Sequence, residues 1–202
     1  MRAHLLALLI SAIGCAKPGA APAAGEGTTP TAGAPAAPGA MAKPGMGLVA
    51  PAVPPELAVP EGQKLTYMAA ARGVQIYECA ADAAGALAWK LHAPRADLVD
   101  DSGAPVASHF GGVDKNLPPG PYWQSTDGSR VHGGSPASVP NPGSIPLLRL
   151  TAVDTSGSGV FSHVSYIQRL DTTGGVSPTG ACTAGERTEV PYTAKYYFYA
   201  AP

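Results

Sequence analysis

The chain has 202 residues, with 13 Lys and Arg against 14 Asp and Glu, and a formal net charge of −1. Charged residues make up only 13% of the sequence, whereas Gly (25) and Pro (22) are abundant. This composition excludes a helical bundle or coiled coil, which needs many charged helix formers and few helix breakers, and it lacks the basic surplus typical of nucleic-acid-binding proteins.

The N-terminus has the pattern of an export signal. A positive charge in residues 1–4 precedes a mostly apolar run over 5–13, which is too short to span a bilayer stably. The residues Ala12-Ile13-Gly14-Cys15 resemble the bacterial lipobox, in which the cysteine is acylated and becomes the new N-terminus. We predict a signal peptide over 1–14 and a lipid on Cys15; the alternative is an ordinary secretory signal with an incidental cysteine. By resemblance to bacterial sorting rules, Ala16 after the cysteine favours the outer membrane.

The next segment is nearly all Ala, Gly, Pro and Thr. Frequent proline removes backbone donors and interrupts helices, and no hydrophobic periodicity is present. We therefore predict that residues 15–52 form the lipidated N-terminus and a disordered linker. As a flexible tether it would span on the order of 35 Å or more between a membrane and the following domain.

Residues 53–202 are predicted to form a single β domain. Short alternating or β-rich runs recur between Gly- and Asp-containing turn signals. The candidate strands are 74–79, 86–92, 147–153, 160–170 and 188–200. This pattern predicts an all-β fold, an antiparallel β-sandwich or barrel of roughly 8–10 short strands. Clustered alanines make 65–72 a candidate helix, and the Tyr-rich final strand could present an aromatic surface to a glycan or protein.

Two cysteines remain once Cys15 is set aside. Cys79 ends a candidate strand, and Cys182 precedes the last one. An even number of cysteines in an exported chain predicts one long-range disulfide; the alternative is two free thiols.

Three stretches of the domain share a pattern with a known family. They are 73–79; 109–111 with 120–123 and 127–129; and 166–170 running through 173–175 to Cys182. Together they resemble domain of unknown function 3455, a family of exported bacterial and fungal domains. Residues 112–119 look inserted relative to that family, and Tyr122 replaces its Thr. The resemblance implies the fold and export but no reaction.

Several polar residues could form a site. His109, Trp123, Asp127 and His132 fall within a short stretch, and a histidine with a carboxylate can act as a general base. The simpler interpretation is that Asp127 caps a turn and Trp123 anchors the core. The histidine spacing matches no metal motif, so we expect neither a metal nor a cofactor.

Gln168 and Arg169 are adjacent in a candidate strand, so they point to opposite faces. A buried arginine must be paired, either with a carboxylate or with loop carbonyls. Alternatively, Arg169 and Arg149 line a cleft for an anionic group, with Gln168 and Trp123 as further ligand-binding candidates.

The sequence predicts an exported cell-envelope lipoprotein, anchored in the membrane by its lipid, whose β domain is a binding or structural module. The partner would be a glycan or a protein, not nucleic acid. One alternative is an envelope hydrolase acting on a polar or glycan substrate, with His109, Asp127 and His132 as catalytic candidates. The other is an enzyme inhibitor.

Overall fold

The computed structural model describes residues 48–202. The predicted signal peptide, Cys15 and the linker up to residue 47 lie outside the described residues. Within 48–202, no helix is long and apolar enough to cross a membrane.

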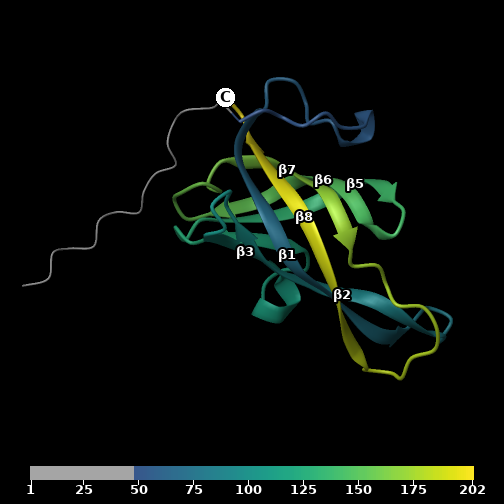
Figure 1. The fold of residues 1–202 in the computed structure, drawn as a ribbon. Coiled ribbons are helices and arrows are strands. Elements are labelled where there is room, and N and C mark those ends of the chain that lie inside the picture. The colour runs from purple at the N-terminus through teal and green to yellow at the C-terminus, as the bar shows by residue number, and fades with distance from the viewer. Residues whose placement is uncertain (1–47) are drawn as a thin grey trace, which may run out of the picture. The chain divides into compact units, whose positions relative to one another are not determined.

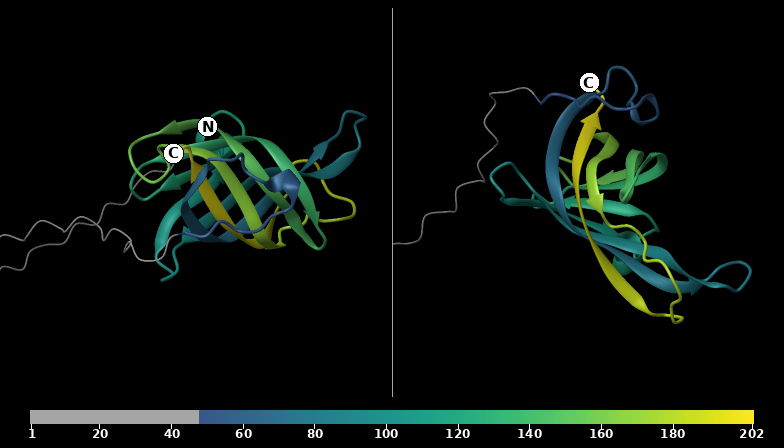
Figure 2. Two further views of the ribbon diagram at one scale, coloured as in Figure 1. Left: turned by 90° about the horizontal axis from the view of Figure 1, so that it is seen from above. Right: turned by 45° about the vertical axis from the view of Figure 1, so that its right-hand side comes forward.

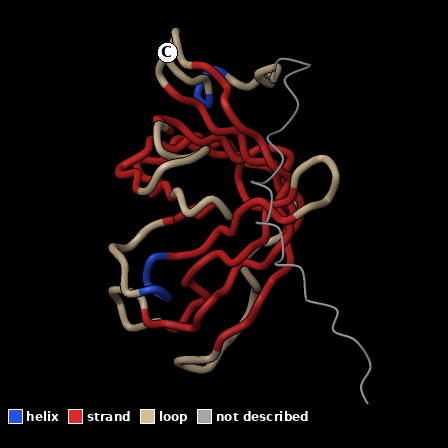
Figure 3. Tube along the Cα trace, turned by 90° about the vertical axis from the view of Figure 1, so that its left-hand side faces the viewer, coloured by secondary structure: helices blue, strands red, loops and turns tan. Residues whose placement is uncertain are grey.

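The described residues form eight antiparallel strands, which confirms the all-β prediction (Figures 1 and 3). Each strand pairs with the next in the sequence, and β8 pairs with β1, so the sheet closes into a barrel. The strands are β1 (Lys64–Ala81), β2 (Leu87–Val99), β3 (Pro105–Gly111), β4 (Pro121–Ser125), β5 (Arg130–Asn141), β6 (Ser144–Ser156), β7 (Val164–Gly174) and β8 (Arg187–Ala200). Of the two predicted architectures, the molecule adopts the barrel.

The prediction of a helix over 65–72 is wrong, because this segment is the first half of β1. Ala69 and Ala71 are buried while Ala70 between them is exposed, which is the alternation of a strand. The segment pairs with β8 along its length and, from Ala70, also with β2. These pairings outweigh the weak helix propensity of alanine, and the small side chains fit beside the aromatic residues of the interior.

Alternation along the strands fills most of the barrel interior with apolar side chains. The fully buried members of this core include Leu98, Trp123, Val131, Phe161, Ile167, Tyr196 and Phe198. Phe161 comes from the loop between β6 and β7 and packs 4.5 Å from Phe198 between ring centroids. The strand predicted over 160–170 therefore begins only at Val164, because the residues before it form this loop.

The N-terminal segment of the described chain packs on the outer face of the barrel. The 3-10 helix η1 (Pro55–Leu57) contacts β5 and β6 (Figure 1). Leu57 is fully buried. Leu57 packs in an outer cluster with Leu170, Tyr197 and Tyr199. Because all the aromatic side chains of β8 are buried, this strand does not present the exposed aromatic surface that the sequence suggested.

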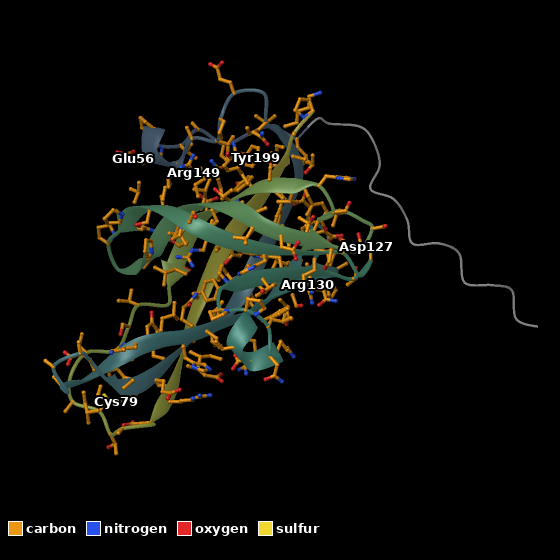
Figure 4. The ribbon with its side chains drawn as sticks, turned by 180° about the vertical axis from the view of Figure 1, so that it is seen from behind. Glu56, Cys79, Asp127, Arg130, Arg149 and Tyr199 are labelled. Carbon is orange, nitrogen blue, oxygen red and sulfur yellow. A yellow bond between two sulfur atoms is a disulfide. The ribbon has the colours of Figure 1, made fainter. Side chains whose placement is uncertain are left out.

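The β1–β2 hairpin and the start of β8 extend beyond one end of the barrel (Figure 2). There the predicted disulfide between Cys79 and Cys182 is confirmed, with 5.8 Å between the Cα atoms and a sequence separation of 103. It joins β1 to the β7–β8 loop. Figure 4 places Cys79 in this extension, well away from Asp127.

Candidate functional site

A cavity of about 590 Å³ opens at the barrel end that carries the β1–β2, β3–β4, β5–β6 and β7–β8 connections. All eight strands contribute to its lining, so we call it the end cavity. Its walls are mostly apolar and include Ile145, Leu148 and Leu150. The larger polar and aromatic side chains in the lining are Gln75, Tyr77, His92, His109, Trp123, Arg169 and Tyr196.

Small residues leave the space at this end. Ala93 and Gly111 line the end cavity, where larger side chains would occupy it. A Cβ atom on Gly111 would come within 2.6 Å of the Ala93 Cβ, so the two strands fit together there only with glycine. Leu91 and Val113 also line the cavity and are about half exposed, at 56% and 46%. They therefore form an apolar rim.

His109 is buried inside the barrel as a neutral side chain. Its Nδ1–H donates to the Tyr122 carbonyl over 2.8 Å, so in the neutral ring Nε2 is an acceptor. The ring stacks on Trp123 with 4.4 Å between centroids. Burial lowers its pKa to about 3, and the charge of Arg169 acts in the same direction against the opposing effect of the Tyr122 hydrogen bond. The ring is therefore uncharged near neutral pH.

Two further donors in the cavity wall are buried. Gln75 Nε2 and Trp123 Nε1 have no hydrogen-bond partner among residues 48–202. A buried donor without a partner costs about 1–3 kcal/mol, and most buried polar groups in proteins avoid this cost. Tyr77 differs from them, because its hydroxyl donates to the Gly175 carbonyl over 2.7 Å.

Arg169 brings a positive charge into the barrel. Its side chain is buried (9% exposed), and both Nε and Nη2 donate to the Pro146 carbonyl, at 3.2 and 2.9 Å. None of the ion pairs within residues 48–202 includes Arg169, and no Asp or Glu of this range lines the end cavity. The carbonyl holds the guanidinium in place but does not neutralise its charge.

The charge of Arg169 acts on the neighbouring tyrosines. Burial raises the pKa of Tyr196, and the positive charge of Arg169 opposes this shift. The same two effects act on the pKa of Tyr77. Arg169 therefore sits among side chains of the end cavity, on the inner face of β7.

The sequence profile of the family described as "Protein of unknown function (DUF3455)" matches residues 60–200. The chain belongs to this family. No curated protein and no solved structure is significantly similar to it.

The segment 112–119, which looks inserted relative to the DUF3455 pattern, lies in the β3–β4 connection. It contains the 3-10 helix η2 (Gly112–Lys115) and leaves the strand pairing intact, because His109 and Trp123 remain directly opposite each other. Tyr122, which replaces the family's Thr, points outward and donates its hydroxyl to the Pro118 carbonyl over 3.2 Å. The insertion therefore adds to the rim without displacing the interior.

The three catalytic candidates of this DUF3455 domain do not come together. His132 stacks on Tyr122 on the outer face, with 4.2 Å between ring centroids. Asp127 lies in the β4–β5 turn and accepts hydrogen bonds from Ser129 and from the Val160 backbone. Burial tends to raise the pKa of Asp127, but these hydrogen bonds lower it overall. Only His109 lines the end cavity.

The side chains of Arg149 and Gln168 lie on the outer face of the barrel, opposite to the side chain of Arg169. Arg149 Nη1 donates to the Ala58 carbonyl over 3.0 Å, and Gln168 Nε2 donates to the Leu57 carbonyl over 2.7 Å. The Tyr199 hydroxyl donates in turn to Gln168 Oε1. Figure 4 shows Arg149 and Tyr199 on the side of the barrel near Glu56. Both candidates hold the N-terminal segment and do not reach the end cavity.

Of the binding candidates, the structure brings Trp123 and Arg169 together with His109 in one cavity. Sequence reasoning missed Gln75, Tyr77 and Tyr196. Gln75 carried a usable signal, since it shares a strand face with Tyr77 and Cys79 and is a polar residue on a buried face. Among residues 48–202, no group of three or more His, Cys, Asp or Glu side chains is arranged to hold a metal ion.

Proposed function

We propose that this protein is a lipid-anchored protein of the bacterial cell envelope whose barrel binds a small, largely apolar molecule in the end cavity. The observation that carries the binding proposal is the cavity itself, which all eight strands line at one end of the barrel. Its volume of about 590 Å³ lies within the ~300–1,000 Å³ range of ligand sites. Apolar walls with a few convergent polar groups are also typical of such sites.

The chemistry of the cavity supports binding over catalysis. A general base works best with a pKa near the operating pH, and the pKa of His109 is lowered to about 3. The carboxylate and the second histidine that would complete a hydrolase site, Asp127 and His132, lie on other parts of the barrel.

The envelope part of the proposal is supported by the sequence of residues 1–15. The lipobox-like Ala12-Ile13-Gly14-Cys15 follows a short signal, and two or three acyl chains make a stable membrane anchor. Mass spectrometry of the mature protein should find acyl mass on Cys15, and Cys15→Ser should release the protein from membranes. An unmodified mature N-terminus elsewhere in the chain would refute the anchor.

The binding proposal is tested with a neutral fluorescent probe, N-phenyl-1-naphthylamine, whose emission rises in an apolar site. We expect saturable binding to the wild-type protein. Leu148→Trp, which fills the cavity from its β6 wall, should weaken binding at least tenfold. Thr151→Trp adds the same side chain at an exposed position of β6 and should leave binding unchanged. Equal binding by both variants would show that the probe binds elsewhere.

A further inference from the structure

We propose that the ligand of the end cavity is an amphipathic monocarboxylate, with its carboxylate bound at Arg169 and its apolar part directed toward the rim. This inference rests on the proposed binding function and adds the chemical class of the ligand. It is carried by the contrast between a buried cation and a cavity wall that offers it no counterion.

Within residues 48–202, Arg169 forms no ion pair and no carboxylate lines the cavity. Two of its N–H groups converge on the Pro146 carbonyl, and a side-chain hydrogen bond links Arg169 to Tyr196, but both of these partners are uncharged. The Pro146 carbonyl satisfies two donors but carries no net charge, so a bound anion would supply the counterion that the protein wall does not.

Arg169 is the only Arg or Lys in the lining, within the described part of the chain. One buried cation matches one negative charge, whereas a dianion such as a phosphate monoester would leave an unpaired charge in the barrel. A carboxylate also fits the planar guanidinium fork through two parallel hydrogen bonds.

Gln75 Nε2 and Trp123 Nε1 lack partners within residues 48–202, and both side chains line the same cavity. Both nitrogen atoms are covered, whereas Arg169 keeps 9% exposure, so the ligand meets Arg169 first. The flexible Gln75 side chain can then turn its amide toward an acceptor-only carboxylate.

The position of Arg169 inside the barrel sets the orientation of the ligand. The charged end of the site is deep, because Arg169 is buried. The rim residues Leu91 and Val113 are apolar and about half exposed, and the wall also contains the partly buried Leu148. A ligand with its carboxylate at Arg169 and its apolar part at the rim therefore places charge against charge and apolar surface against apolar surface.

The experiment measures displacement of N-phenyl-1-naphthylamine from the wild-type protein by decanoate, decanol and decyl phosphate at a pH near 8. We expect decanoate to bind at least tenfold more tightly than decanol and decyl phosphate, because a charge-assisted pair is worth about one to two orders of magnitude in affinity. Equal affinity for decanoate and decanol would overturn the carboxylate inference, and so would tighter binding of decyl phosphate. Neither result affects probe binding, which tests the proposed function separately.

Two arginine variants locate the headgroup. Arg169→Met should remove the advantage of decanoate over decanol while the neutral probe still binds, and Arg169→Lys should retain part of it. Arg149→Met is the matched control, since Arg149 donates to the Ala58 carbonyl outside the barrel, and it should behave as the wild type. A decanoate preference that survives Arg169→Met would overturn the assignment. The wild-type comparison remains decisive even if Arg169→Met fails to fold.

Discussion

Acidification should destabilise the barrel through His109. The folded-state pKa of this buried ring is about 3, against about 6.5 in an unfolded chain. Above pH ~6.5 the ring is neutral in both states, so it makes no difference to stability. As the pH falls below that value, His109 binds a proton in the unfolded state but not in the folded state. The free energy of unfolding therefore drops by about 2 kcal/mol at pH ~5, and the decline continues until the pH reaches about 3.

Urea denaturation of the wild type and of His109→Asn at pH ~7.5 and ~5 measures this loss. Asparagine keeps a donor for the Tyr122 carbonyl and does not titrate, so the variant is less stable at pH ~7.5 but lacks this part of the pH dependence. Every other ionisable group is common to the two proteins. The reasoning is refuted if both proteins lose the same free energy on acidification, or if NMR shows the His109 ring titrating near pH 6.5.

Three further perturbations test the rest of the fold. Replacing Cys79 and Cys182 by alanine should lower the free energy of unfolding by up to about 4.7 kcal/mol, measured by urea denaturation, since the bridge closes a loop of about 100 residues. Leu57→Ala should cost about 2–5 kcal/mol in the same assay, because the side chain is fully buried on the outer face; a change below 1 kcal/mol would contradict this packing. Asp127→Ala should cost about 1–2 kcal/mol, visible as a lower Tm, and should leave probe binding unchanged.

Local patterns predicted the class of fold but not its closure. Alternation and turn residues are properties of neighbouring positions, and they indicated antiparallel strands correctly. The pairing of β1 with β8 joins the two ends of the domain, and no local pattern records it. The same long-range pairing explains why the alanine-rich segment 65–72 forms a strand although alanine favours a helix.

The site was predictable by residue type but not by position. A histidine, a tryptophan and an arginine in β-rich sequence are reasonable candidates, and His109, Trp123 and Arg169 do share the end cavity. The sequence could not tell which face of β7 is the inside, so Gln168 and Arg169 stood as equals. An exposed residue would normally mark the outer face of a strand. Here residues 53–59 cover the outer face of β7, so Gln168 and Arg169 are both buried.

The two faces of the barrel treat their buried polar groups differently, and this difference is the strongest argument for a ligand. On the outer face, the buried Gln168 donates to the Leu57 carbonyl and accepts from the Tyr199 hydroxyl. Those bonds hold an outer cluster together and are fully explained by folding. Inside, Arg169 keeps an uncompensated charge beside an apolar cavity. Replacing buried charged groups by apolar residues of similar volume is often neutral or stabilising, so folding alone gives little reason for such a charge. The anion recognition that we propose gives one.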